Sequence, residues 1–326
     1  MSDKQTSGRD GFAPGVRHLQ VGEEAAGQRL DNFLVRELKG VPHGHLYRLL
    51  RTGQVRVNGG RRKPAYRLVA GDDLRLPPVR IAERVPATGP LRRVSALLES
   101  DVIYEDKWLL AVAKPSGVPV HGGSGLSGGL IEALRILREE PELELVHRLD
   151  RDTSGVIVIA RRRSALRILH EAFREGRVEK RYLALLLGRV EEPFTSDAPL
   201  ARYVKRGGER HVAVSEAGKA SITRFEPVSP GERASLVAAL PATGRTHQIR
   251  VHAAAAGHPV AGDTRYGDKE ANRALHSAGL KRLALHAAAI AFAHPNSGEP
   301  LEIEAALPRD LASVIPILAR PTGARV

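Results

Sequence analysis

The sequence contains no cysteine among its 326 residues. This absence excludes disulfide bonds, thiolate metal ligands and thiol catalysis. The chain also lacks any apolar run near the roughly 20 residues that a membrane-spanning helix needs, and its polar, glycine-rich beginning contains no apolar stretch of the signal-peptide type. Hydrophobic residues make up 42% of the chain, which is typical of a globular protein. We therefore expect a soluble, cytoplasmic protein.

Positive charge is in clear excess. The chain has 50 Lys and Arg against 37 Asp and Glu, a formal net charge of +13 and a pI near 10.4. Residues 1–80 alone hold 15 basic and 8 acidic side chains, so this quarter carries +7. A field of this sign favours a polyanionic partner, and nucleic acid is the commonest one. The alternative is a well-solvated surface in an arginine-rich proteome.

The first 96 residues are predicted to form a flexible tail, a small α+β domain and a proline-rich linker, at 1–16, 17–77 and 78–96. Leucine spacing in the small domain predicts two helices between 28 and 54, separated by a Gly-Val-Pro break. Strand patterns follow at 55–59 and at 66–76, where a strand pair is expected to turn at Gly71-Asp72.

The remaining residues, 97–326, are predicted to form one larger domain in which strands and helices alternate. Strands are expected at 102–104, 109–113, 155–160, 182–187, 234–240 and 283–292, and helices at 130–140, 164–176 and 246–256. Because the order has no strict strand-helix-strand rhythm, we predict an α+β fold with a mixed, mainly antiparallel sheet and helices on its faces.

Histidines are numerous, and His247, His252 and His258 lie close together in the sequence. Their spacing does not fit a helical zinc pair, and no acidic ligand lies nearby. We therefore predict no metal site and assign these histidines to the core or to contact with RNA.

The run Val146–Ala160 places Asp150 between two arginines and directly before an apolar, β-branched strand. A carboxylate at the mouth of such a strand would be partly desolvated and would need a cationic partner to stay ionised. An ionised carboxylate in a dry site is a usable nucleophile. The alternative interpretation is that residues 152–155, Asp-Thr-Ser-Gly, merely form a turn that leads into the strand.

Four separated blocks of sequence carry a resemblance. They are Lys114-Pro115-Ser116-Gly117, His147-Arg148-Leu149-Asp150-Arg151-Asp152-Thr153-Ser154-Gly155, Lys180-Arg181-Tyr182-Leu183-Ala184 and Gly244-Arg245-Thr246-His247-Gln248-Ile249-Arg250-Val251-His252. Through these blocks, residues 97–310 resemble the pseudouridine synthases of the RluA family. Residues 17–77 resemble an S4 RNA-binding domain, which precedes the catalytic domain in many of these enzymes.

The resemblance implies a role for individual residues. Asp150 matches the catalytic aspartate, and Arg245 matches the basic residue that pairs with it. Tyr182 matches the tyrosine that packs on the target base and is implicated in proton transfer. Arg148 matches the arginine that enters the RNA stack when the base leaves. Basic side chains of the S4-like domain are expected to contact RNA, namely Arg48, Arg51, Arg56, Arg61, Arg62 and Lys63.

The implied activity is the isomerisation of chosen uridines to pseudouridine in large-subunit ribosomal RNA. It involves no redox change or energy input, so no cofactor is expected, and we expect a monomer. Whether Asp150 attacks C6, attacks C1′ or abstracts a sugar proton stays open. Two alternatives also stay open: a non-catalytic RNA-binding or ribosome-assembly protein, and a glycosidase that uses Asp150 with Asp152.

Overall fold

In the computed structural model, the chain is described at residues 15–38, 41, 43–79, 101–122, 128–204 and 210–319. It divides into two compact units, Met1–Thr88 and Gly89–Val326. Almost all of the predicted tail and linker lie outside the described residues, so the domain boundaries stay a prediction. Within the described ranges, no helix has both the length and the apolar character needed to cross a membrane.

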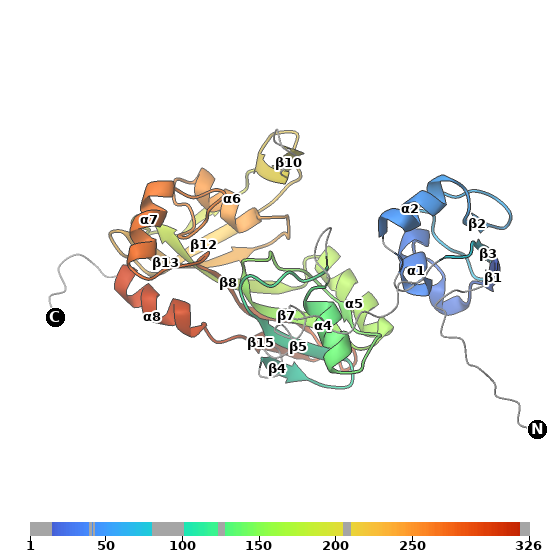
Figure 1. Ribbon diagram of the computed structural model, residues 1–326. Helices are drawn as coiled ribbons and strands as arrows, with labels where there is room; N and C mark the ends of the chain where they lie inside the picture. The colour runs from blue at the N-terminus through green and yellow to red at the C-terminus, as the bar shows by residue number, and fades with distance from the viewer. Residues whose placement is uncertain are drawn as a thin grey trace, which may run out of the picture. The chain divides into compact units, whose positions relative to one another are not determined.

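The N-terminal unit packs two helices on a small antiparallel sheet (Figure 1). Its elements in chain order are β1 (Arg17–Gln20), the short 3-10 helix η1 (Glu23–Ala25), α1 (Leu30–Glu37), α2 (His43–Arg51), β2 (Arg56–Val57) and β3 (Asp73–Leu76). The sheet has the order β1-β3-β2. Leucines from both helices and from β3 are buried together, including Leu34, Leu46 and Leu74. The two predicted helices and the strand after them are therefore confirmed.

The strand pair predicted at 66–76 is wrong in its first half. Only β3 is a strand, and its antiparallel partners are β1 and β2. The preceding residues instead pair with the segment that leads into α1: the amide of Leu30 donates to the carbonyl of Tyr66, and that of Leu68 donates to the carbonyl of Gln28. The turn at Gly71-Asp72 is real, since Asp72 accepts a hydrogen bond from the amide of Val69, but it leads the chain into β3 rather than closing a hairpin.

The C-terminal unit is organised by a ten-stranded sheet, whose main path is β4-β5-β7-β14-β8-β13-β12-β9. The strands are β4 (Val102–Glu105), β5 (Leu109–Lys114), β6 (Glu144–Leu145), β7 (Ser154–Ala160), β8 (Glu179–Leu187), β9 (Phe194–Ser196), β12 (Thr223–Ser229), β13 (Ala234–Pro241), β14 (Leu285–Ala293) and β15 (Pro300–Glu304). Only β7 and β14 pair in parallel among the strand pairs described. The predicted mixed, mainly antiparallel α+β fold is confirmed.

Helices cover this sheet and complete its core. They are α4 (Leu130–Leu137), α5 (Arg163–Arg174), α6 (Gln248–Ala255), α7 (Lys269–Ser277) and α8 (Arg309–Leu318). Leu169 of α5 is buried against β5, β7 and β14, whereas Ile249 of α6 is buried against β8, β12 and β13. A separate hairpin of β10 (Leu200–Val204) and β11 (Arg210–Val214) lies beside α6 (Figure 1).

Several predicted boundaries are displaced by a few residues, among them those of one helix and one turn. The helix predicted at 130–140 ends at Leu137, and Glu139 adopts a left-handed conformation with φ of 54°. The turn predicted at 152–155 lies instead at Asp150–Thr153, where the amide of Thr153 donates to the carbonyl of Asp150. Ser154 and Gly155 already belong to β7, because the sheet takes them into its parallel pairing with β14.

Candidate active site

The turn that carries Asp150 is placed by the strand that follows it. Gly155 has φ of 115° and lies opposite Ala287 in the parallel β7–β14 pair. A Cβ atom at Gly155 would lie 2.1 Å from the carbonyl oxygen of Ala287, so only glycine allows this close approach. The glycine that ends the Asp-Thr-Ser-Gly run thus fixes where the strand begins and where Asp150 stands.

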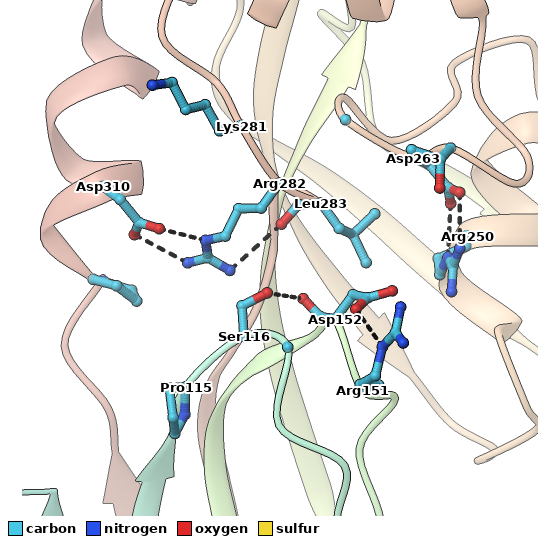
Figure 2. A pocket seen from close by; sticks show the side chains of 14 residues that line it. Pro115, Ser116, Arg151, Asp152, Arg250, Asp263, Lys281, Arg282, Leu283 and Asp310 are labelled. Atoms are coloured by element: carbon cyan, nitrogen blue, oxygen red, sulfur yellow. Dashed lines mark hydrogen bonds and ion pairs between the residues drawn. The ribbon is translucent and has the colours of Figure 1, made fainter. Parts of the chain in front are cut away.

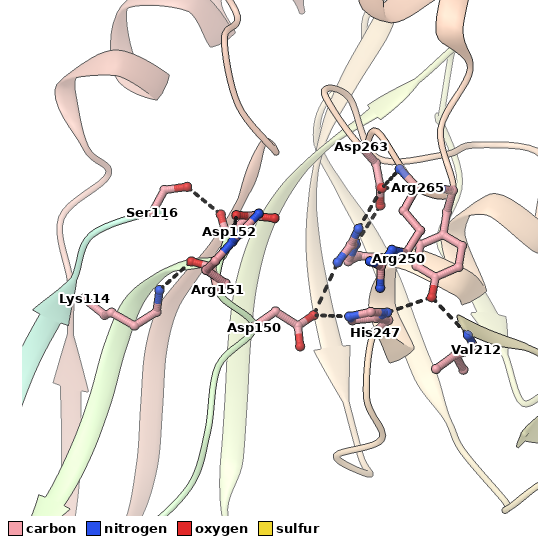
Figure 3. A network of polar contacts seen from close by, with 11 residues as sticks. Lys114, Ser116, Asp150, Arg151, Asp152, Val212, His247, Arg250, Asp263 and Arg265 are labelled. Carbon is pink, nitrogen blue, oxygen red and sulfur yellow. Dashed lines mark hydrogen bonds and ion pairs between the residues drawn. The ribbon is translucent and has the colours of Figure 1, made fainter. Parts of the chain in front are cut away.

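A buried lysine supports the same turn from behind. Lys114, at the end of β5, is 1% exposed, and its ammonium group donates to the carbonyls of Pro115, Val118 and Arg151, each at 2.9 Å. Burial lowers the pKa of Lys114 to about 7, against the pull of nearby carboxylates. Because three carbonyls use all three protons, the ammonium form ties β5 to the residue that follows Asp150 (Figure 3).

The rest of the Lys-Pro-Ser-Gly block adds two hydrogen bonds to this support. The hydroxyl of Ser116 donates to the carbonyl of Asp152 at 2.7 Å, and the amide of Gly117 donates to the carbonyl of Arg151 at 2.9 Å. In the sequence, this block is only part of a family resemblance. In the structure, its residues donate hydrogen bonds to the backbone carbonyls of the turn that carries Asp150 and so stabilise that turn.

His147 anchors the chain before Asp150. Its ring stacks on Phe173 of α5 with centroids 5.3 Å apart, and its Nε2 accepts a hydrogen bond from the amide of Val158. Burial, assisted by the positive charge of Lys180, lowers the pKa of His147 to about 3. The imidazole is therefore neutral, as an accepting nitrogen requires.

The wall that faces Asp150 is built around a buried ion pair. Arg250 of α6 is 6% exposed and Asp263 is 1% exposed. The two form a bidentate pair, with Nε and Nη2 donating to the carboxylate at 2.7 and 2.8 Å. The amides of Arg265 and Tyr266 donate to the same carboxylate. Burial alone would raise the pKa of Asp263, but these donors hold it below its usual range.

Asp150 lies against this wall. Its Oδ2 is 3.7 Å from Nη1 of Arg250 and 3.8 Å from Nε2 of His247, and its side chain is 20% exposed (Figure 3). Arg250 thus uses two of its nitrogens on Asp263 and presents the third to Asp150. The arrangement provides a carboxylate that is partly desolvated, opposed by a fixed cation and still open to a ligand.

Tyr182 stands near the carboxylate on β8. Its register places it opposite Ala239 of β13 and Ala287 of β14, and it packs against the apolar cluster that includes Ile249. Burial raises the pKa of Tyr182 above its ordinary value, and the negative charge of Asp150 raises it further. The phenol is therefore neutral and half-buried, with a ring that is available for packing.

Two predicted residues occupy more exposed places. Arg245 is exposed, and its Nε donates to the carbonyl of Ala220 at 3.2 Å, whereas the cationic side chain placed against Asp150 is that of Arg250. Arg148 is exposed two residues before Asp150. The roles predicted for Arg245 and Arg148 stay predictions.

Sequence reasoning gave no role to Arg250 or Asp263 and assigned His247 to the core or to contact with RNA, although His247 and Arg250 both lie in a quoted block. The spacing of His247 and Arg250 could have indicated that they lie together, since residues three apart share a helix face. His247 is the N-cap residue of α6 and Arg250 follows it by three, and both side chains lie near Asp150. The choice between Arg245 and Arg250 depended on knowing that the helix begins at Gln248, after Arg245.

A pocket of about 580 Å³ lies next to this site and shares part of its wall (Figure 2). Arg282, whose Nε donates to Asp310 and whose Nη1 donates to Ser154, lines it. Asp150 is not a lining residue, whereas its neighbours are. The lining residues are Pro115, Ser116, Gly117, Arg151, Asp152, Arg250, Gly262, Asp263, Thr264, Lys281, Arg282, Leu283, Pro308 and Asp310.

The cations predicted to contact RNA in the N-terminal unit are all exposed, as a polyanion surface requires: Arg48, Arg51, Arg56, Arg61, Arg62 and Lys63. Some of them have local partners. The guanidinium of Arg62 lies 5.0 Å from the ring centre of Tyr66, and Arg56 donates to the carbonyl of Gly59. Their contact with RNA stays a prediction.

Two family models match the chain. One, described as RNA pseudouridylate synthase, matches residues 108–255, and the other, described as S4 domain, matches residues 28–74. A protein from Yersinia pestis named ribosomal large subunit pseudouridine synthase C is 53% identical over 302 residues, which are 91% of this chain and 94% of that protein. The protein of the same name from Escherichia coli (strain K12) is 54% identical over 304 residues, 91% of this chain and 95% of that protein.

Solved structures agree in fold. Human RNA pseudouridylate synthase domain containing 1 superimposes with a TM-score of 0.54 at 31% identity, covering 64% of this chain and 83% of that one. Human RNA pseudouridylate synthase domain containing 4 gives a TM-score of 0.57 at 24% identity, covering 70% of this chain and 97% of that one. The second likeness concerns the fold alone.

Proposed function

The chain belongs to the RNA pseudouridylate synthase family, and we propose that it isomerises chosen uridines to pseudouridine in large-subunit ribosomal RNA. The membership confirms the family that the sequence blocks predicted. The choice of ribosomal RNA rests on the names of the similar proteins, and the positive charge of the chain supports it.

The observation that carries the proposal is the position of Asp150. The carboxylate is held on a turn that Lys114 and Gly155 fix, and it faces Arg250 at 3.7 Å while its side chain remains 20% exposed. A nucleophilic carboxylate needs a charge that is retained and a geometry that does not relax. Arg250 helps Asp150 to retain its charge, and the supported turn keeps its geometry fixed.

The chemistry is an internal rearrangement. The N1–C1′ bond of uridine breaks, the uracil rotates, C5 bonds to C1′, and the proton on C5 is lost while N1 ends with a proton. Atoms and electrons balance without a co-reactant. The base is stacked in folded RNA, so the nucleotide must first be extruded into the site. Asp150 then acts at C6, at C1′ or on a sugar proton.

We assign Tyr182 to the face of the extruded base. A neutral, half-buried phenol offers a flat apolar surface and a hydroxyl that can donate to one polar atom of the uracil. Because burial and Asp150 raise its pKa, Tyr182 is poorly suited to remove the C5 proton as a phenolate. Tyr182→Phe should therefore retain much more activity than Tyr182→Ala.

One assay tests the proposal. The protein is incubated with large-subunit ribosomal RNA that lacks modification, and pseudouridine is scored at every uridine. Wild-type protein should form pseudouridine at a small set of positions. Asp150→Asn keeps the shape of the side chain and loses its charge, so turnover should fall by at least about a thousandfold while RNA binding stays nearly unchanged.

The same assay decides against the other candidates. A non-catalytic RNA-binding protein would bind the RNA and form no pseudouridine at any position. A glycosidase would release free uracil, and such enzymes flank the bond with a second carboxylate. Asp152 is engaged by Arg151 at 2.9 Å, which argues against that second role.

A further inference from the structure

His247 touches Asp150 but has no part in the reaction as described so far. Its Nε2 faces the carboxylate at 3.8 Å, and its backbone adopts a left-handed conformation with φ of 55°. Residues other than glycine adopt that conformation uncommonly, although histidine does so more often than most, so the surrounding structure helps to hold His247 there. A strained backbone position beside a nucleophile suggests a functional reason for the side chain that it presents.

The other ring nitrogen of His247 is the end of a hydrogen-bonded chain. Nδ1 lies 2.7 Å from the hydroxyl of Tyr266, and that hydroxyl accepts a hydrogen bond from the amide of Val212 at 3.1 Å (Figure 3). An amide can only donate, so the Tyr266 oxygen accepts there and its own proton is available for His247. The tyrosine ring is also held, since the Arg250 guanidinium lies 5.1 Å from its centre.

One neutral tautomer satisfies every partner in this chain. If Nδ1 accepts from Tyr266, the ring proton is on Nε2 and points at a carboxylate, which can only accept. The opposite tautomer would place a lone pair against Asp150. Burial lowers the pKa of His247, although Asp150 opposes this shift, so the ring is neutral at neutral pH.

On these observations, and resting on the proposed function, we propose that His247 is a positioning residue for Asp150. The Val212 amide orients the Tyr266 hydroxyl, the hydroxyl selects the tautomer of His247, and the Nε2 proton holds Asp150 ionised and aimed. This series of hydrogen bonds begins at Val212 in β11, so it connects the β10–β11 hairpin with Asp150. A second contact supports this link, because the Arg202 side chain in β10 donates to the hydroxyl of Thr246.

The first test reads the tautomer without any substrate. In protein labelled with ¹⁵N-histidine, the ring shifts of His247, assigned by their loss in His247→Asn, should report a proton on Nε2 and a lone pair on Nδ1 at neutral pH. Tyr266→Phe should remove that preference, whereas Tyr104→Phe, which removes a hydroxyl bound to Asp106, should not. A proton on Nδ1 in the wild-type protein would overturn the proposal.

The second test reads the consequence for the reaction. Asn adopts the left-handed conformation readily, so His247→Asn should fold, while its shorter amide no longer reaches Asp150 from the position of Nε2. The contact to Asp150 is expected to shorten in the complex, and we expect a turnover loss of about 10- to 100-fold with little change in KM. His247→Gln, whose longer amide can still donate to Asp150, should recover part of it, since Gln adopts the left-handed conformation less readily than His. His276→Asn changes an exposed histidine and should have no effect.

The pH profile separates positioning from mere structure. His247 and Arg250, at the start of α6 and within it, face Asp150. Tyr182 and Lys114, on the sheet, interact with its charge electrostatically. His247 itself is influenced by Arg250, Arg265, Asp150 and Asp263. Removing one donor favours the protonated carboxylic acid, so the acid side of the single-turnover profile of His247→Asn should move to higher pH. A loss that is uniform between about pH 5 and pH 9 would contradict the proposal.

A double variant closes the test. Tyr266→Phe alone should lower turnover by about 3- to 10-fold, the effect of one neutral hydrogen bond. If it acts through His247, it should have no further effect in the His247→Asn protein, and additive losses would overturn the chain. If the wild-type protein formed no pseudouridine at all, the proposed function would fail, and the ¹⁵N shifts would still decide whether Tyr266 sets the tautomer.

Discussion

The two units of the chain use positive charge in different ways. In the N-terminal unit, Arg48, Arg51, Arg61 and the other predicted RNA contacts are exposed. In the C-terminal unit, the two cations that shape the candidate site are buried, Lys114 at 1% and Arg250 at 6% exposure. The first kind of cation faces solvent and the second faces carbonyls and carboxylates of the protein itself.

This difference separates attraction from geometry. An exposed cation attracts a polyanion over a distance that salt shortens, and it can be replaced by another nearby. A buried cation holds groups that would otherwise be left unpaired in a low dielectric, so its removal is costly and insensitive to salt. We expect the N-terminal unit to govern how tightly RNA binds, and the buried cations to govern whether the bound uridine reacts.

The largest expected effect is that of removing the buried guanidinium. Arg250→Met should lower single-turnover rates by about 100- to 1000-fold and lower the free energy of unfolding by about 3 to 5 kcal/mol, because Asp263 is left buried without its partner. Both losses should be the same at low and high salt. Single-turnover kinetics and denaturant unfolding at two salt concentrations measure them.

Two matched variants sharpen this result. Arg181→Met breaks an exposed pair with Glu304, in which the side chains are 46% and 62% exposed, and should change stability by less than about 1 kcal/mol. Arg245→Met decides which arginine serves Asp150. If it costs as much turnover as Arg250→Met, the role predicted for Arg245 holds and the position of Arg250 at 3.7 Å is not the decisive one.

Arg148 is an intermediate case, since it is exposed but lies two residues before the nucleophile. The predicted role is to fill the gap that the extruded uridine leaves, with a planar guanidinium stacked between bases. Extrusion costs a few kcal/mol in folded RNA and much less in an unstructured strand. Arg148→Ala should therefore lower the single-turnover rate by about 10- to 100-fold on a folded stem-loop and only several-fold on a short unstructured RNA. If Arg148→Ala lowered the single-turnover rate by the same factor on both RNAs, Arg148 would serve only as an ordinary contact with RNA.

A smaller effect is expected from the exposed cations. Changing Arg61, Arg62 and Lys63 to Gln should make the dependence of log affinity on log salt shallower by up to about 0.9 for each phosphate that the protein no longer neutralises. Single-turnover rates at saturating RNA should stay unchanged. The matched control removes the same charge from the other unit by changing Arg162, Arg167 and Arg174, which are exposed on or beside α5, to Gln. If the salt dependence becomes shallower by the same amount in both triple variants, the N-terminal unit has no special part in binding.

The contrast between the units also explains what the sequence could predict. The fold class, the two N-terminal helices and most central strands followed from apolar periodicity, because the strands are long and buried, as β7 is throughout. The strands of residues 194–229, the helices α7 and α8, and the strand β15 were missed. β9 is a three-residue strand at the edge of the sheet, and β12, which lies beside it, alternates only weakly between buried and exposed residues.

Within the site, the sequence did not show which blocks lie against one another. Asp263 lies outside the four quoted blocks, and the other site residues lie within them: Lys114, Asp150, Tyr182, His247 and Arg250. Asp150 could be selected from the chemistry of a carboxylate before an apolar strand and from the family resemblance, and Tyr182 from the resemblance alone. The choice of Arg250 over Arg245 as the neighbour of Asp150 required the start of α6, and helix boundaries are the least reliable part of such reasoning. The three-carbonyl environment of Lys114 required contacts between segments 37 residues apart.

The smallest expected effect concerns His147, a half-buried group of the protein interior that is assigned no contact with the substrate. His147 is neutral because burial, with the charge of Lys180, lowers its pKa to about 3, while an unfolded histidine titrates near 6.5. Below about pH 6.5 the unfolded chain therefore binds a proton that the folded chain does not, so the stability contributed by neutral His147 is lost as the pH falls from there toward 3. At pH 5 the loss should be about 1 to 2 kcal/mol relative to pH 7.

His147→Gln removes the titration and keeps an oxygen that can accept from the amide of Val158. The free energy of unfolding of this variant should therefore depend less steeply on pH, by that amount. His170→Gln changes an exposed histidine of α5 and should retain the wild-type dependence. The single tryptophan, Trp108, lies in the C-terminal unit, so its fluorescence follows the unfolding of the unit that contains His147. If wild type and His147→Gln lost stability in parallel between pH 7 and pH 5, the buried imidazole would not be the group that makes this unit sensitive to acid.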